Sequence, residues 1–201
     1  MGISLESVPA DNIKEVAAFG AFFVRRHQPW KQYYEVPRHE RNLDVPIVLM
    51  IVRFNGTFGF VGGVCEPDEL PAAALEREMR EELAYNEGGD GFKHIASHRM
   101  SVRGLDSHFF AKEVTEEELS IIETNARSAP HWGCEVMSTV RVPMSVTKRG
   151  GGLENFLRNS FEFGVQHELA QLLSKEELLE ASALSSAFGG AGLDLQELLT
   201  V

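Results

Sequence analysis

The sequence is poor in cysteine. Cys65 and Cys134 are its only two, and they lie far apart without the spacing of a metal site. A disulfide framework is therefore not expected, and a reducing compartment is favoured. The chain also lacks any run of eighteen apolar residues, which excludes a predicted transmembrane helix, and its N-terminus lacks the pattern of a secretory signal. These absences predict an intracellular protein with no membrane partner.

Basic residues are also scarce. The chain has 19 Lys and Arg against 30 Asp and Glu, and its formal net charge is −11. Proteins that grip nucleic acid through its phosphates usually carry a basic face, so tight sequence-independent binding of RNA or DNA is not expected. A small anionic substrate remains compatible with this charge, because divalent cations can bridge carboxylates and phosphates. The 201 residues, 43% of them hydrophobic, suit one domain with a sizeable core.

Hydrophobic patterning predicts strands and helices that alternate without a strict βαβ rhythm. Asn55-Gly56 is a strong hairpin signal, Asp68 or Glu69 is expected to cap the helix that follows, and Gly164 is expected to interrupt the last helical stretch. The expected strands are 15–26, 45–54, 57–63, 93–103, 106–114 and 136–146, and the expected helices are 70–85, 115–127 and most of 153–181.

This mixture favours an α+β protein with an α/β/α sandwich around a mixed sheet. We expect a loosely ordered N-terminus over 1–14, a long loop over 27–44, one domain over 15–181, and a C-terminal tail over 182–201. Pro143 in the last strand predicts a sheet edge or a bulge.

The segment that carries chemistry is GVCEPDELPAAALEREMREELAY, residues 63–85. On a helix, Glu78, Glu81 and Glu82 are three and four residues apart, so their carboxylates share one face. Like charges at this spacing repel one another, and a cation would compensate them. Oxygen ligands suit Mg²⁺ or Mn²⁺ better than zinc. The alternative is a solvated acidic face, which is what most charge runs are.

The whole segment resembles the Nudix box, and only Ala84 departs from it, standing where the box has glycine. A chance match of this length is rare. The resemblance implies that Glu78, Glu81 and Glu82 bind metal, with the carbonyl of Gly62 or Gly63 as an extra ligand. It also implies that Arg77 orients a box glutamate, most simply Glu69; an ordinary surface ion pair is the alternative for Arg77.

Flanking segments are similar to one branch of this superfamily, the snoRNA-decapping enzymes that also hydrolyse inosine and xanthosine diphosphates. The segments are RFNGTFGFVGG (53–63), SHFFAK (107–112), CEVMSTVRVP (134–143) and GGLENFLRNSF (151–161), within a resemblance that spans about 45–175. The resemblance implies that Arg53 and Phe60 contact the nucleotide and that Glu135 is a further metal ligand or a catalytic base. The alternatives are core packing for Phe60 and a solvated loop acid for Glu135.

Two departures concern the base of the substrate. The histidine that reads hypoxanthine in this branch aligns with Gly20 or its neighbours, and His27 comes several residues later. A substrate-contacting glutamine aligns with Glu168, and a carboxylate offers only acceptors where an amide also donates. These departures question the preference for inosine, not cleavage of the diphosphate. His98, His108 and His131 are each more typical of structural histidines.

The resulting hypothesis is a metal-dependent hydrolase of a nucleoside-linked diphosphate, either inosine or xanthosine diphosphate or the cap of an RNA. Glu81, Glu82 and Glu135 are the candidate catalytic residues, and Arg53, Phe60 and Glu168 are the candidate substrate contacts. The resemblance also implies a homodimer and a nuclear or nucleolar address, with the cytoplasm as the alternative. Three rival hypotheses are a hydrolase of ADP-ribose or a dinucleotide, a non-catalytic RNA-binding or protein-binding relative, and a domain with an accidental acidic helix.

Overall fold

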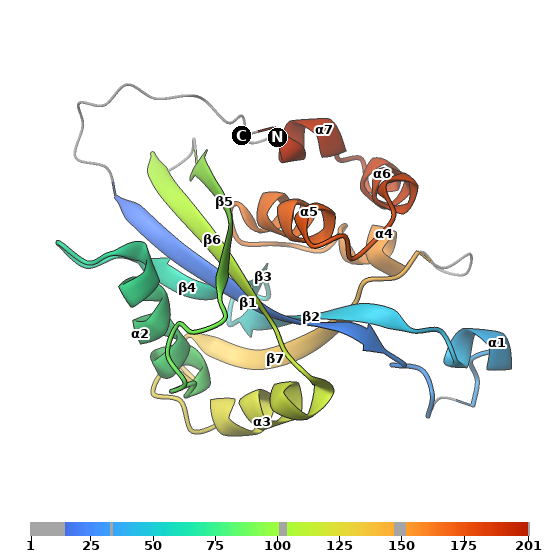
Figure 1. Ribbon diagram of the computed structural model, residues 1–201, viewed down its shortest axis with the longest axis horizontal. Helices are drawn as coiled ribbons and strands as arrows, with labels where there is room; N and C mark the ends of the chain where they lie inside the picture. The colour runs from blue at the N-terminus through green and yellow to red at the C-terminus, as the bar shows by residue number, and fades with distance from the viewer. Residues whose placement is uncertain (1–14, 33, 101–103, 147–151, 201) are drawn as a thin grey trace.

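The sheet is built around β1 (Val16–His27), whose apolar residues are buried on both faces along most of the strand. In the computed structural model, which describes residues 15–32, 34–100, 104–146 and 152–200, β1 pairs with three other strands (Figure 1). It is antiparallel to β2 (Val45–Arg53) and β4 (Val61–Val64), and parallel to β6 (Leu105–Glu113). A strand covered on both faces reads as a continuous apolar run, which explains the sequence of β1.

Three further strands complete a mixed seven-stranded sheet. These are β3 (Phe58–Gly59) and β7 (Val136–Pro143), both antiparallel to β2, and β5 (Lys93–Met100), antiparallel to β6. The strand order is β3-β2-β1-β6-β5, with β4 on β1 and β7 on β2. Within the described ranges β7 pairs with no strand other than β2, so Pro143 lies on an edge strand, as its missing N–H predicts.

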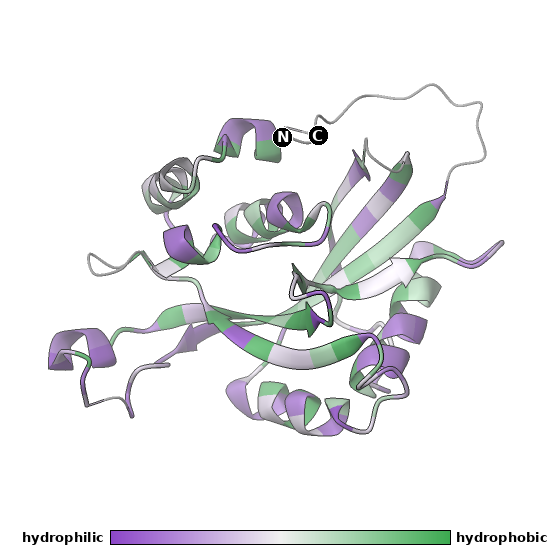
Figure 2. Cartoon of the chain, turned by 180° about the vertical axis from the view of Figure 1, so that it is seen from behind, coloured by the Kyte–Doolittle hydropathy of each residue, from purple (hydrophilic) through white to green (hydrophobic). Residues whose placement is uncertain are grey.

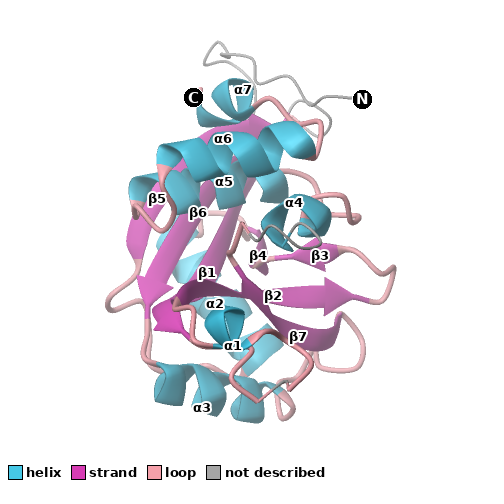
Figure 3. Ribbon diagram, turned by 90° about the vertical axis from the view of Figure 1, so that its right-hand side faces the viewer, coloured by secondary structure: helices cyan, strands magenta, loops and turns pink. Residues whose placement is uncertain are grey.

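Helices cover both faces of the sheet. One layer holds α2 (Pro71–Leu83) and α3 (Glu116–Ala126), and the opposite layer holds the C-terminal helices (Figures 1 and 3). Those are α4 (Gly152–Phe156), α5 (Val165–Lys175), α6 (Ala181–Gly190) and α7 (Leu195–Leu199). This is the α/β/α sandwich of the α+β class that the sequence predicted.

Each layer has its own hydrophobic core. Phe23 and Phe109 face the α5 side of the sheet, together with Leu169 of that helix. Phe22 faces the other side and packs near Met79 of α2. The alternation of faces along β1 therefore places neighbouring phenylalanines in different cores. Figure 2 shows the same division, with strands that are green over much of their length and a helix α3 that alternates between green and purple.

The start of α2 differs from the expected cap. The N-cap residue is Leu70, whose side chain has no atom that can accept a hydrogen bond, and Pro71 occupies the first turn. The expected caps, Asp68 and Glu69, lie before it; the Glu69 carboxylate instead accepts from the Glu66 N–H at 2.8 Å and from Arg77. The prediction of the cap was wrong because Glu69 serves a more distant partner. Proline tolerates this start, since the first N–H groups of a helix lack intrahelical partners.

The expected C-terminal tail over 182–201 contains two short helices. Residues 181–190 and 195–199 are helical, and Leu184, Phe188 and Leu195 are buried in the α5-side core. The Gln171 side chain donates to the Leu198 carbonyl at 3.1 Å. Weak local propensity was misleading here, because short helices gain most of their stability from packing. The expected loop over 27–44 contains the short helix α1 (Arg38–Arg41), and the prediction for 1–14 falls outside the described residues.

None of the helices within the described part of the chain is long and apolar enough to cross a membrane.

Candidate active site

Two glycines let the helix α2 approach strand β4 closely. Gly62 has a φ of 142°, and a Cβ there would collide with the Ala18 backbone carbonyl. A Cβ on Gly63 would collide with the carboxylate of Glu78. The Gly62 N–H donates to Oε2 of Glu82 at 3.0 Å. A larger side chain is excluded at Gly62 by the backbone of β1, whereas at Gly63 it would require the Glu78 carboxylate to shift. The two glycines thus place the backbone against two box glutamates.

Arg77 holds the acids of the box together, as the resemblance implied. Its Nε donates to Oε1 of Glu69 at 3.1 Å and its Nη2 to Oε2 of Glu69 at 3.0 Å. Its Nη1 donates to Glu78 at 2.7 Å and to Glu81 at 3.1 Å, and its Nη2 also reaches the Val64 carbonyl at 3.1 Å. The planar guanidinium thereby fixes three carboxylates. The alternative of an ordinary surface ion pair does not describe these contacts.

Glu82 is the most deeply buried acid of the box, with 0% exposure. Nη1 of Arg53 donates to its Oε1 at 2.5 Å, and Nη2 of Arg53 lies 3.4 Å from the Gly62 carbonyl. Burial raises the pKa of the Glu82 carboxyl to about 7, although the charge of Arg53 and the Gly62 N–H oppose that rise. A carboxyl with this pKa can take up or release a proton near neutral pH.

Within the described residues, no three His, Cys, Asp or Glu side chains stand as a metal-binding group. In this arrangement Nη1 of Arg77 lies close to both Glu78 and Glu81, and Nη1 of Arg53 lies close to Glu82. The chemistry of the donors nevertheless fits a hard divalent cation, because carboxylates and a backbone carbonyl are oxygen ligands.

A cleft of about 400 Å³ opens beside these acids. Four of the predicted site residues line it together: Arg53, Phe60, Gly62 and Glu135. Glu78, Glu81 and Glu82 do not line the cleft themselves, but Glu82 is joined to its wall through Arg53 and Gly62. The fold thus unites residues from β2, β4, α2 and the segment before β7.

Phe60 lies both in the core and at the wall of the cleft, and its contact with a nucleotide stays a prediction. It is 2% exposed and its ring centroid lies 4.8 Å from that of Phe109, so it belongs to the core. It also lines the cleft. A buried ring at the wall of a cleft keeps its position through core packing and can still offer one face to a ligand.

Glu135 lies on the segment between α3 and β7, with its carboxylate half exposed. Its Oε2 is 3.6 Å from Nη1 of Arg53, and its Oε1 is 3.4 Å from Nδ1 of His131. The His131 N–H in turn donates to the Glu81 carbonyl at 2.8 Å, which ties this segment to the end of α2. The Glu135 N–H donates to the His131 carbonyl at 3.0 Å, so the backbone of His131, which the sequence analysis did not assign to the site, helps to hold Glu135 beside the cleft.

Glu168 does not join the cleft. It is 1% exposed and accepts a hydrogen bond from Ser107 Oγ at 2.9 Å. Burial raises the pKa of its carboxyl to about 8, so it is mostly protonated at neutral pH. Its role as a substrate contact, inferred from the alignment with a glutamine, stays a prediction.

The fold shows where Gly20 lies, the position that aligns with the base-reading histidine of the family. A Cβ on Gly20 would meet Leu75 and Met79 of α2, so this position faces away from the cleft. Its neighbour Phe19 lines the cleft instead. His27 lies at the far end of β1, where Nδ1 is 2.9 Å from Oε2 of Glu116.

Two aromatic residues at the mouth of the cleft were missed by the sequence analysis. Phe54 and Phe163 are 56% and 45% exposed, and both line the cleft. They stand on segments fastened by Glu162, whose Oε1 accepts from Asn55 Nδ2 at 3.0 Å and from Thr57 Oγ1 at 2.5 Å. Only their places in the sequence could have indicated them: Phe54 follows Arg53, and Phe163 precedes Gly164.

Comparison with known proteins points to one family. Residues 39–179 match the family model described as Nudt16-like, U8 snoRNA-decapping enzyme-like. The chain is 37% identical over 145 residues to the U8 snoRNA-decapping enzyme of Mus musculus, covering 69% of this chain and 73% of that protein. It is 30% identical over 149 residues to the Tudor-interacting repair regulator protein of Mus musculus, covering 72% of this chain and 69% of that protein.

Solved structures share the fold at low sequence identity. A MutT/nudix family protein from Enterococcus faecalis superposes with a TM-score of 0.56 at 10% identity, covering 95% of this chain and 79% of the other. A mutT/nudix family protein from Listeria innocua gives a TM-score of 0.52 at 14% identity, covering 83% of this chain and 98% of the other. These likenesses concern the architecture alone.

Proposed function

Because the chain belongs to the U8 snoRNA-decapping enzyme-like family and is a Nudix hydrolase, we propose that it cleaves a nucleoside-linked diphosphate with Mg²⁺ or Mn²⁺. The substrate is inosine or xanthosine diphosphate, or the cap of an RNA. The observation that carries the proposal is the contact between the buried Glu82 and Arg53, which joins the acids of α2 to the wall of the cleft.

The residues divide the chemistry between them. Glu78, Glu81, Glu82 and the Gly62 carbonyl would hold the cation, with Glu135 as a further candidate ligand. When bound, Mg²⁺ or Mn²⁺ supplies Lewis acidity to the diphosphate. Glu82 or Glu135 accepts the proton of the attacking water. Arg53 stabilises the charge that develops on the leaving phosphate, and Phe60 stacks against the nucleoside.

The test is a panel of inosine diphosphate, xanthosine diphosphate, capped RNA and ADP-ribose, each with Mg²⁺, Mn²⁺ or EDTA. Inosine or xanthosine diphosphate is read by phosphate release, and the other substrates by chromatography of their products. We expect metal-dependent turnover that falls at least a hundredfold in Glu82→Gln, on the order of the effect of removing an essential proton acceptor. Glu117→Gln, an exposed acid on α3, is the matched control and should act like wild type. Wild-type activity in Glu82→Gln would refute the assignment.

The two rival functions predict different outcomes of the same panel. A hydrolase of ADP-ribose or a dinucleotide would cleave that substrate preferentially, because box residues handle only the diphosphate. A binding protein would show no turnover, and relatives of 30–34% identity named Tudor-interacting repair regulator proteins favour this reading. Retention of Arg77 and all three helical glutamates favours hydrolysis.

Two further parts of the proposal rest on the family. We propose a homodimer, which sedimentation of the purified chain would test, and a nuclear, nucleolar or cytoplasmic site of action. A net charge of −11 argues that a capped RNA is held by its end through the cation, without a long electrostatic grip on the RNA body.

A further inference from the structure

The inner part of the catalytic cleft is apolar. Four side chains, each 3% exposed or less, form a floor that core packing keeps in place: Phe60, Met100, Leu105 and Val165. Met100 ends β5, Leu105 begins β6 and Val165 begins α5, so three separate elements meet at this floor. Its side chains contain no nitrogen or oxygen atom. Such a surface suits the flat, apolar face of a purine better than its polar edge.

Phe19 continues the floor toward the end of the cleft where the cation and the diphosphate would lie. It is the cross-strand partner of Gly62 in the antiparallel pair of β1 and β4. A Cβ on Gly62 would lie only 2.8 Å from Cδ1 of the Phe19 ring. The Phe19 side chain is half-buried and lines the cleft. An apolar ring therefore stands beside the backbone carbonyl that is a candidate ligand of the cation.

The polar side chains of the cleft lie at its rim and at its acid-bearing end, where they contact other parts of the protein. At the rim, Asn55 Nδ2 donates to Glu162 Oε1 at 3.0 Å, and Asn55 Oδ1 accepts from the Thr57 N–H at 3.0 Å. At the other end, Nη1 of Arg53 lies 3.6 Å from Oε2 of Glu135. The floor between these two groups is left to apolar contacts.

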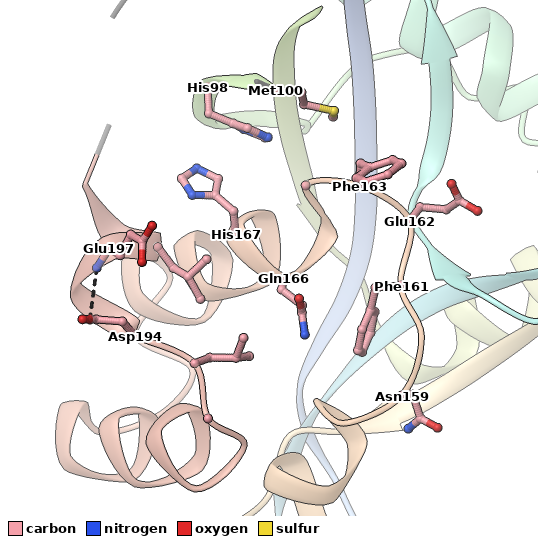
Figure 4. Close-up of a pocket in the computed structure, with 14 residues that line it drawn as sticks. His98, Met100, Asn159, Phe161, Glu162, Phe163, Gln166, His167, Asp194 and Glu197 are labelled. Carbon is pink, nitrogen blue, oxygen red and sulfur yellow. Dashed lines mark hydrogen bonds between the residues drawn. The ribbon is translucent and has the colours of Figure 1, made fainter. Parts of the chain in front are cut away.

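Two exposed rings stand at the mouth of the cleft. Phe54 and Phe163 are 56% and 45% exposed, so each has a ring surface that a ligand can cover. Figure 4 shows Phe163 on the segment that leads into α5, next to Met100 of the floor. A planar base that lies on the floor can therefore stack against the ring of Phe163.

We propose that the cleft holds the base of its substrate by stacking on Phe163 and the floor, and accepts purine nucleotides regardless of the groups on the purine edge. Stacking tolerates different bases because every base has a π-face. Hydrogen bonds to the edge discriminate strongly, because the wrong base leaves buried polar groups unpaired, and the floor has no such groups. The inference rests on the proposed function and deepens it, since it widens the substrate class from inosine and xanthosine to adenosine and guanosine diphosphates.

The test is binding of the 5′-monophosphates of inosine, guanosine and adenosine to the full chain in Mg²⁺, measured by calorimetry. These compounds contain the base but no diphosphate to cleave, and ribose 5-phosphate serves as the ligand without a base. We expect the three dissociation constants to agree within about fivefold, and ribose 5-phosphate to bind at least about tenfold more weakly than any of them. A larger preference for one purine, or equal binding of ribose 5-phosphate, would overturn the inference.

Variants of Phe163 test the stacking itself. Phe163→Leu keeps an apolar side chain but removes the ring, and should weaken all three nucleotides at least about threefold while leaving ribose 5-phosphate unchanged. Phe163→Tyr keeps the ring and should bind like wild type. Tyr34→Ala is the matched control, because Tyr34 is an aromatic residue, 87% exposed, that does not line the cleft.

A smaller loss of nucleotide binding in Phe163→Leu, or an equal loss for ribose 5-phosphate, would show that the ring does not stack on the base. The same loss in Phe163→Tyr as in Phe163→Leu would also overturn the inference. Failure of the proposed function looks different: the three monophosphates would bind with similar strength, but no substrate of the panel would be hydrolysed.

Discussion

Arg53 and Glu82 form an ion pair between a strand and a helix, with Nη1 of the arginine 2.5 Å from Oε1 of the glutamate. The carboxylate is fully buried and the guanidinium is 19% exposed. The pair couples the helix that bears the acids to the wall of the cleft. It also compensates a charge that would otherwise be costly to hold away from water.

Breaking this pair should destabilise the fold. In Arg53→Met the Glu82 carboxyl loses the charge that lowers its pKa, so it must take up a proton to stay buried at pH 7, and we expect the free energy of unfolding to fall by about 2 kcal/mol. The double variant Arg53→Met/Glu82→Gln should regain part of that loss, because the amide needs no proton uptake, while staying inactive. Urea denaturation measures both. Strictly additive losses in the double variant would contradict the coupling.

Replacing Ala84 by glycine, the residue that the box has at this position, should stabilise the fold. Ala84 caps α2 in the left-handed region, at φ 52° and ψ 30°, where a Cβ is disfavoured. We expect Ala84→Gly to raise the free energy of unfolding by about 1 kcal/mol. Ala74→Gly, in the interior of the same helix, is the control and should lower it. Loss of stability in Ala84→Gly, measured by thermal unfolding, would contradict the argument from this backbone angle.

Glu168 should make the protein less stable as the pH rises. Its pKa is about 8 in the folded state against an ordinary 4.5, so between about pH 4.5 and 8 the folded protein keeps a proton that the unfolded chain has lost. Stability from this group is full below pH 4.5 and is lost as the pH rises through 8. Glu168→Gln keeps an acceptor for Ser107 and removes this titration.

Urea denaturation from pH 5 to 9 tests this prediction. We expect Glu168→Gln to exceed wild type by about 1 kcal/mol or more at pH 8, with the difference shrinking toward pH 5. Glu117→Gln should follow the wild-type profile. A difference in the free energy of unfolding that does not vary with pH would contradict the assigned titration of Glu168.

Divalent cations should stabilise the wild-type chain. A ligand that binds only the folded state adds about 2.7 kcal/mol at a hundred times its dissociation constant. We expect Mg²⁺ or Mn²⁺ to raise the melting temperature of wild type, and to raise that of Glu78→Gln much less, each relative to its own value in EDTA. Potassium chloride of equal ionic strength is the control. Equal shifts in both proteins would remove Glu78 from the ligand set.

The sequence predicted what depends on local periodicity. Helical spacing placed Glu78, Glu81 and Glu82 on one face, and the helix expected over 115–127 begins with a capping box between Thr115 and Glu118. Gly164, expected to interrupt the helical stretch, begins α5 at φ 86°. In each case the determining contacts lie within a few residues along the chain.

What escaped prediction depends on contacts between distant segments. Glu168 reads as a polar position on a helix, but Ser107, 61 residues earlier, lies against it in the core. The C-terminal residues have weak helical propensity, and their helices are held by packing of Leu184 and Phe188. Phe163 carries no motif of its own, and only the fold brings it to the cleft. Such positions need the tertiary arrangement to be interpreted.

The Glu162 carboxylate accepts a hydrogen bond from Asn55, a residue 107 positions away, and thereby ties together two surface loops that lie outside the Nudix box. Lengthening or shortening either loop would re-size the entrance without disturbing the acid-bearing helix behind it. Relatives could thus accept different substrates through changes in loop length, while the residues that carry out hydrolysis stay the same. Differences in substrate among relatives should therefore be sought at this hydrogen bond between the loops more than in the box itself.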